Sequence, residues 1–346
     1  MHRALILFSL YRSLCPLKRW VHLAGLLIVG FSALSFAATE IPLVSKFSKF
    51  GLIYEPSGVQ QLPDGRLIVV EDESDQPLDV ISLQPDDRVS EQALYRNSLF
   101  SLISPNRALG TLEDLEAVAV DGQSRIYVIT SHSRKKNGKR PDKREQLMRF
   151  TLDGEKAVDI QVLRDLHKNI FQKYKYLEHT SRTSNVEDDG GFNIEGLSFD
   201  VTKQKLLIGL RSPLAGDNAI IIVLENPLVV FDHNETPRIS DTLIELDLGG
   251  GGIRALSYDQ HLGGYLILSR KQGKKFKLWL WSGDTDESPQ RLQVPDVKNL
   301  RHAEGITPVR LQDGQTGILI VSDDGDVVKG KPGHYLFLRY EQLFSK

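Results

Sequence analysis

The sequence contains only one cysteine, Cys15, among 346 residues, which excludes both a disulfide framework and a zinc site built on cysteine thiolates. An excess of either charge is also absent, because 43 Lys and Arg residues oppose 45 Asp and Glu residues. The formal net charge of -2 therefore gives no overall basic field for binding nucleic acid. The hydrophobic fraction of 40% is ordinary for a globular protein and excludes disordered, collagen-like and low-complexity chains.

Long apolar runs are confined to the N-terminus. There, several Arg and Lys residues precede an uncharged run over residues 21–36, and the run ends in the small-x-small motif Ser35-Phe36-Ala37. This order predicts a signal peptide over residues 1–37, cleaved after Ala37, and hence a periplasmic or secreted protein. A retained membrane anchor is the competing interpretation, but the run is short for a span of about 20 residues.

The remaining chain, residues 38–346, is predicted to form one domain. No later run is apolar enough to span a membrane, so no transmembrane segment is expected after signal cleavage. Cleavage also removes Cys15, the one thiol of the chain. A protein without thiols suits an oxidising compartment, since it cannot form wrong disulfides there.

Short alternating apolar runs, separated by turns rich in Gly and Asp, predict an all-β protein. One unit recurs five times, with an opening strand, a short turn and an apolar second strand. The five opening strands start at Ser57, Glu116, Glu195, Arg254 and Glu304. The repeat predicts a five-bladed β-propeller in which an N-terminal strand within 43–50 completes the last blade. A sixth blade within 84–113 and a β-sandwich are the alternatives.

The longest connections are expected on one face of this propeller. The first strand of each blade lines the central channel, so the starts of first strands and the ends of second strands share a face, named here the mouth face. Residues 91–113, 132–145 and 164–192 are predicted to connect strands there. Long loops on a rigid scaffold are where binding sites concentrate.

Charged residues gather at the same predicted face. Glu195 should lie beside Arg211 across one hairpin, and Arg254 beside Arg270 across the next. The two arginines would repel each other unless a carboxylate or an anionic ligand neutralises them. Structural ion pairs that hold the blades in register are the other interpretation. The predicted ligand-binding residues are Glu116, His132, Glu195, Arg211, Arg254, Arg270, Glu304 and Asp323.

A metal site is the second possibility at this face. Glu304, Asp323 and Asp324 are expected to be neighbours, and they would repel unless one is protonated or a cation binds. Calcium is the candidate cofactor, because it prefers carboxylate oxygens.

The segment 134–144 holds seven basic residues against one acid, Asp142. It is a candidate for attracting an anionic small molecule or a polyanion, or it is a solvated loop. Aromatic residues are not interleaved with its charges, so nucleic acid is not an expected partner.

Ser131, His132 and Ser133 suggest a hydrolase, but the G-x-S-x-G pattern is missing and a serine nucleophile is not expected. The oligomeric state is not predicted.

Several motifs resemble one bacterial family, the domain of unknown function DUF3616. The resemblance is strongest in Asn193–Phe199 (NIEGLSF), Leu206–Pro213 (LLIGLRSP) and Ser131–Arg134 (SHSR), and extends to Gly252–Leu256 and Ala303–Ile306. It implies an exported β-propeller with no assigned reaction. The family looks distantly like the esterase-like, phytase-related propellers.

Two functional hypotheses remain, and whether the protein is an enzyme is left open. In the first, the mouth face binds an anionic ligand or partner without catalysis. In the second, it is a divalent-cation-assisted hydrolase of a phosphate or other ester. The second hypothesis places a metal on Glu116, Glu195, Glu304 and Asp323 and the anion on Arg211, Arg254 and Arg270.

Overall fold

The structure is a computed structural model that describes residues 46–72, 75–96, 104, 106–184, 186–294, 297 and 299–344. All of them belong to one compact unit, Leu43–Lys346. The predicted signal peptide, residues 1–37, lies outside the described residues. Within the described ranges, no helix is both long and apolar enough to cross a membrane.

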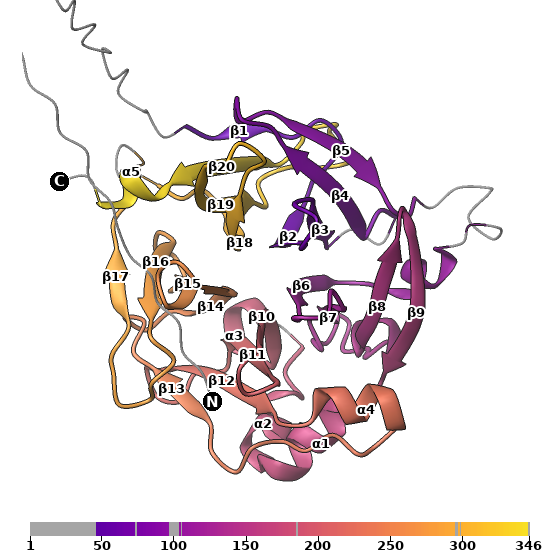
Figure 1. Cartoon of the computed structure of the whole chain (residues 1–346). Helices are drawn as coiled ribbons and strands as arrows, with labels where there is room; N and C mark the ends of the chain where they lie inside the picture. Colours follow the sequence, from indigo (N-terminus) through magenta and orange to yellow (C-terminus); the bar gives the residue numbers. More distant parts are fainter. Residues whose placement is uncertain are drawn as a thin grey trace, which may run out of the picture. The chain divides into compact units, whose positions relative to one another are not determined.

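Five four-stranded antiparallel sheets surround a central axis, which confirms the predicted five-bladed β-propeller (Figure 1). Blade 1 contains β2 (Pro56–Gln61), β3 (Leu67–Glu71), β4 (Leu78–Leu83) and β5 (Val89–Ala93). Blade 2 contains β6 (Leu115–Val120), β7 (Ile126–Thr130), β8 (Leu147–Asp153) and β9 (Lys156–Leu163). Blade 3 contains β10 (Asn193–Asp200), β11 (Lys205–Ser212), β12 (Ala219–Leu224) and β13 (Ile244–Leu246). Blade 4 contains β14 (Gly252–Asp259), β15 (Gly264–Arg270), β16 (Lys277–Trp281) and β17 (Gln290–Leu292).

Blade 5 is completed by the N-terminal strand, as predicted. It contains β18 (Ala303–Arg310), β19 (Thr316–Ser322), β20 (His334–Arg339) and β1 (Ser48–Lys49). In the antiparallel register, Ser48 faces Tyr335 and Lys49 faces His334. The described part of 84–113 holds β5 and a short 3-10 helix, η2 (Arg107–Thr111), and no sixth blade. Pairing the first strand with the last protects sheet edges that would otherwise be exposed.

Apolar side chains between neighbouring blades form the core. The second strand of blade 1 is buried along its whole length, Leu67–Glu71. One cluster joins Tyr127 and Ile129 of blade 2 to Ile208 and Ile222 of blade 3. Each such side chain contributes about 1.5–3 kcal/mol when fully buried, so the interfaces between blades hold the ring together.

A β-bulge occurs at the same place in the inner strand of every blade. The pairing of first and second strands shifts there by one residue, which leaves one residue unpaired and redirects its side chain. The next residue is Gly or Ala because the inner strands converge: a Cβ on Gly305 would lie 2.9 Å from the Cα of Gly58. The residues at the five shifts are Ser57, Glu116, Glu195, Arg254 and Glu304.

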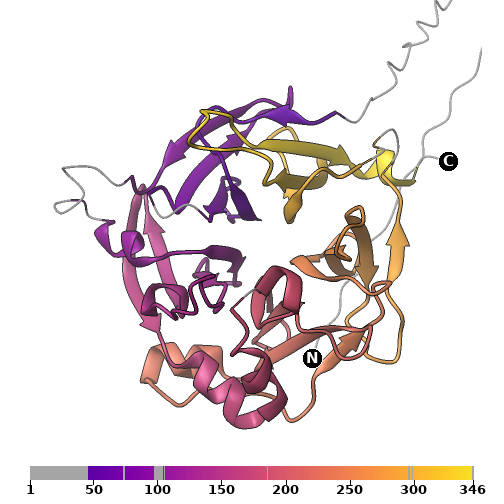
Figure 2. The same cartoon turned by 180° about the vertical axis from the view of Figure 1, so that it is seen from behind.

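Short helices fill the long connections of the mouth face. Residues 164–192 form α1 (Leu166–Lys173), α2 (Lys175–Thr180) and α3 (Val186–Asp189), which face the viewer in Figure 2. Residues 134–144, named here the basic segment, contain the 3-10 helix η3 (Asp142–Arg144). Of the other helices, α4 (Pro227–His233) connects β12 to β13, and α5 (Tyr340–Phe344) follows β20.

Candidate functional site

A cavity of about 530 Å³ opens at the mouth face, and residues from all five blades line it. It is named here the mouth cavity. Seven of the eight predicted ligand-binding residues lie in its wall: Glu116, Glu195, Arg211, Arg254, Arg270, Glu304 and Asp323.

A chain of ion pairs connects blades 3, 4 and 5 at the cavity floor. Arg211 Nη1 lies 2.8 Å from Glu195 Oε1, which is the predicted contact across one hairpin. Arg254 Nη1 lies 2.8 Å from Glu195 Oε2, and Arg254 Nη2 bonds Glu304 Oε1. Burial lowers the pKa of Arg254, and the Glu195 carboxylate opposes this shift. Two carboxylates thus balance two guanidinium groups.

Arg254 and Arg270 are neighbours, as their strands predict, and share an aromatic ring. The guanidinium carbons lie 5.7 Å (Arg254) and 5.0 Å (Arg270) from the centroid of Phe276. Arg270 Nε also donates to the Lys274 carbonyl at 3.3 Å. Among the residues that the structure describes, no carboxylate lies within ion-pair distance of Arg270. Arg270 is therefore a cation of the cavity wall without a balancing anion.

Four further carboxyl groups of the cavity lining are named here the acidic wall: Asp72, Asp114, Glu116 and Asp323. Glu116 is only 9% exposed. Burial, and then the carboxylates of Glu195 and Asp114, raise the pKa of Glu116 well above its ordinary value. Burial raises the pKa of Asp323 to about 6, although Arg254 opposes this shift. Glu116 is therefore expected to hold its proton at neutral pH, and Asp323 to take one up as the pH falls through about 6.

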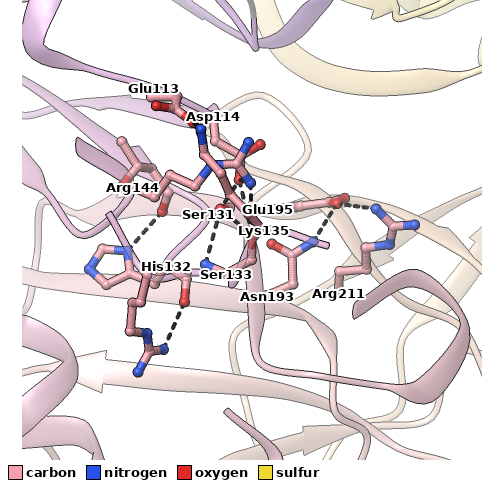
Figure 3. A network of polar contacts seen from close by, with 12 residues as sticks. Glu113, Asp114, Ser131, His132, Ser133, Lys135, Arg144, Asn193, Glu195 and Arg211 are labelled. Carbon is pink, nitrogen blue, oxygen red and sulfur yellow. Dashed lines mark hydrogen bonds and ion pairs between the residues drawn. The ribbon is translucent and has the colours of Figure 1, made fainter. Parts of the chain in front are cut away.

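Hydrogen bonds attach the basic segment to blade 2 (Figure 3). Asp114 Oδ2 accepts hydrogen bonds from Ser131 Oγ and, at 3.1 Å, from Ser133 Oγ, and lies 2.9 Å from Arg144 Nη1. Glu113 pairs with Arg144 at 2.9 Å and with Lys135 at 2.5 Å. The segment is not simply a solvated loop, since its residues Arg134, Lys135, Lys136 and Arg144 line the cavity.

The hydroxyl of Ser133 lies beside the carboxylate of Asp114 and not beside a histidine. Its partners within the described ranges are Ser131, Asp114 and Arg144, and none of them is an imidazole. A serine nucleophile needs a base that an acid orients. Among the described residues, Ser133 and its hydrogen-bond partners do not include the histidine that a Ser-His-Asp triad contains.

His132 does not line the mouth cavity, contrary to the prediction. It is fully buried, and its Nδ1 lies 2.9 Å from the Thr130 carbonyl. Its ring packs against His167 of α1, with centroids 6.2 Å apart, and burial lowers its pKa to about 3. Strand β7 ends at Thr130, and His132 has a φ of 55°, so the backbone leaves the strand alternation on which the prediction relied.

The three predicted metal ligands are not brought together. Glu304 pairs with Arg254, while Asp324 bonds Arg301 and lies 2.7 Å from His334 Nδ1. Of the three, only Glu304 and Asp323 line the mouth cavity. In the described part of the chain, no group of three or more His, Cys, Asp or Glu side chains is arranged to hold a metal ion.

The residues of the cavity wall that sequence reasoning missed include Asp114, Asn193 and His302. Each lies two residues before a bulge residue, namely Glu116, Glu195 or Glu304. Side chains two residues apart on a strand share a face, so the two-residue spacing was the signal that could have identified them.

The fold and the cavity define a five-bladed β-propeller with a charged pocket at the mouth of its channel. A family model described as "Protein of unknown function (DUF3616)" matches residues 156–335, which is more than half of the chain. The chain belongs to this family, as the sequence motifs indicated. No curated protein matches the chain significantly in sequence.

Several solved structures are similar to this one. A gluconolactonase of Xanthomonas campestris, XC5397, is 10% identical, with 85% of this chain and 90% of that chain covered and a TM-score of 0.39. The allergen Mala s 1 of Malassezia sympodialis is 12% identical, with 84% and 79% covered and a TM-score of 0.38. A Bacteroides thetaiotaomicron protein of unknown function is 10% identical, with a TM-score of 0.36. The match to the Bacteroides protein covers 84% of the present chain and 59% of the Bacteroides chain. Such similarities assign no activity.

Proposed function

We propose that this protein is an exported β-propeller that binds an anionic small molecule in the mouth cavity. The observation that supports this function is the uncompensated guanidinium of Arg270 in the cavity wall. The cavity volume of about 530 Å³ lies in the range of small-molecule sites. Export is supported by the signal peptide that the sequence predicts.

The distribution of charge in the wall favours an anion. Arg211 and Arg254 are balanced by Glu195 and Glu304, as described above. Arg134 directs Nε to the Ser181 carbonyl at 2.8 Å and Nη1 to the Gly138 carbonyl at 2.9 Å, so neutral groups hold it. Its charge therefore adds to that of Arg270. Surplus cations in a partly enclosed, low-dielectric pocket attract an anion more strongly than cations on an open surface.

The alternative, a divalent-cation-assisted hydrolase of a phosphate or other ester, requires several carboxylate oxygens that converge on one point. The ion pairs of Glu195 and Glu304 with Arg254 leave these two carboxylates committed to a guanidinium. This geometry does not favour the alternative, and a calcium titration tests it in the same assay.

The test is titration calorimetry and thermal unfolding with inorganic phosphate and sulfate, on protein purified from cells that express the full chain. Arg270→Gln should weaken binding by about tenfold, because it removes one full charge from the wall. Arg88→Gln is the matched control, since Arg88 is 81% exposed and pairs with Asp86 far from the cavity residues in sequence. Equal binding by Arg270→Gln and the wild type, or no binding of either anion, would overturn the proposal. A shift with calcium alone would favour the alternative.

A further inference from the structure

Two hydrogen-bond acceptors in the wall of the mouth cavity have no partner. Glu116 is nine-tenths buried, and no described residue forms a hydrogen bond or ion pair with its carboxyl group, whose carbonyl oxygen accepts even when the group is protonated. Asn193 is 5% exposed, and its Oδ1 is a buried atom without a partner in the described structure. A buried acceptor without a donor is costly, so native structures usually supply one from a ligand or water.

The orientation of the Asn193 amide is determined by its neighbour. Its Nδ2 donates to Glu195 Oε1 at 3.1 Å (Figure 3). Exchanging the amide oxygen and nitrogen would place the oxygen against the carboxylate, where two acceptors repel. The unpartnered atom of Asn193 is therefore an acceptor that needs a donor from elsewhere.

The same cavity thus offers both surplus cations, Arg134 and Arg270, and unpartnered acceptors. A simple inorganic anion would satisfy Arg270 and leave Glu116 and Asn193 to be satisfied by water. A ligand for the whole cavity has to carry negative charge and also donate hydrogen bonds.

Hydroxyl groups fit these acceptors better than an ammonium group does. Asn193 and Glu195 lie beside two cations, Arg211 and Arg254, which would repel an ammonium group. A hydroxyl is neutral and can both donate to an acceptor and accept from a guanidinium or a protonated carboxylate. The acidic wall, in which Glu116 holds a proton, is suited to such groups.

We infer that the ligand of the mouth cavity is a polyhydroxylated anion, such as a sugar phosphate or a sugar acid. Its anionic group lies towards Arg270, and its hydroxyls donate to Glu116 and Asn193. This inference rests on the proposed function, because it names the class of anion that the same cavity selects.

The test compares three kinds of probe by titration calorimetry. Inorganic phosphate carries only the charge, glucose carries only the hydroxyls, and a panel of hexose 6-phosphates, hexonates and hexuronates carries both. At least one member of the panel should bind about tenfold more tightly than phosphate or glucose. Glu116→Leu, which removes both oxygens at similar size, should remove about tenfold of that affinity and change phosphate binding by less than about twofold. Arg270→Gln should weaken both.

Two further variants protect the test from a folding failure. Glu116→Asp keeps the carboxylate but shortens the side chain, and Asn193→Ser removes the unpartnered carbonyl; thermal unfolding verifies that each is folded. Both should lose affinity for the panel member and retain affinity for phosphate. If phosphate binds and no panel member binds more tightly, or if Glu116→Leu leaves the panel affinity unchanged, this inference is wrong and the proposed function stands. If neither phosphate nor any panel member binds, the proposed function is wrong as well.

Discussion

The guanidinium of Arg254 joins the carboxylate of Glu195 on one side to that of Glu304 on the other, and so connects three consecutive blades at the axis. Arg254 is 5% exposed, so these pairs are shielded from water. Removing one partner of a buried ion pair leaves an uncompensated charge and costs about 3–5 kcal/mol.

Arg254→Ala should therefore destabilise the propeller by about 3 kcal/mol or more, because two buried carboxylates then face each other. Denaturant unfolding monitored by circular dichroism measures the change. Arg88→Ala, at an exposed pair, should change stability by less than about 0.5 kcal/mol. A loss below about 1 kcal/mol for Arg254→Ala would show that this ion-pair chain does not hold the blades together.

Glu71 and Asp79 form a buried pair of acids within blade 1. Glu71 Oε2 accepts from the backbone of Tyr54 at 2.7 Å and of Glu55 at 3.1 Å, and Gln76 Nε2 donates to both carboxylates. Burial, and then the hydrogen bond and charge of Asp79, raise the pKa of Glu71 to about 9. Glu71 therefore keeps its proton in the folded protein over a pH range where the unfolded chain has lost it.

A raised carboxyl pKa lowers stability progressively as the pH rises from the unfolded value to the folded one. For Glu71 this range runs from 4.5 to about 9. Glu71→Gln removes the ionisation and can still donate to Asp79, so it should be more stable than the wild type. The gain should increase between about pH 5 and about pH 9 and reach about 1 kcal/mol or more. Urea unfolding across this range measures it, and a gain that does not vary with pH would argue against the assignment.

Asp323 should make anion binding dependent on pH. Burial raises its pKa to about 6, so it becomes neutral as the pH falls through that value and stops repelling an anion. Sulfate affinity should increase several-fold from about pH 7.5 to about pH 5, by the linkage between proton and ligand binding. Sulfate is chosen because it does not titrate in this range.

Asp323→Asn should bind sulfate more tightly than the wild type at about pH 7.5 and should show a weaker pH dependence. Asp86→Asn is the control, because Asp86 pairs with exposed Arg88 and does not line the cavity. Calorimetric titrations at both pH values measure the difference. The same pH dependence in Asp323→Asn and the wild type would assign the titration to another group.

Export predicts a defined mature N-terminus. Expression of the full chain in a bacterial host should yield a periplasmic protein that begins at Ala38, because Ala37 ends the small-x-small motif. Mass spectrometry of the fractionated protein measures this directly. Ala37→Arg should block processing, whereas Glu40→Gln, three residues beyond, should not. An unprocessed mass in the membrane fraction of the wild type would favour the retained anchor.

The blade pattern was predictable because alternation with a period of two, repeated five times, leaves few other arrangements. The same reasoning located Glu116, Glu195 and Arg254 at the mouth, since strand order fixes which strand ends share a face. His132 was assigned wrongly because a left-handed backbone conformation cannot be identified from its sequence neighbours. The pairing of Glu304 with Arg254 was also missed, since the distance between side chains of adjacent blades depends on bulges that the sequence does not mark.

Because β1 pairs with β20, the last blade is not complete until two segments that lie far apart in the sequence, near the two ends of the described chain, meet. Such a contact of long sequence separation forms late and slows folding. Until then, the outer edge of β20 presents unpaired backbone groups that could associate with other chains. Aggregation of newly made protein should therefore be most sensitive to changes in the two residues of β1, Ser48 and Lys49, although they contribute little to the core.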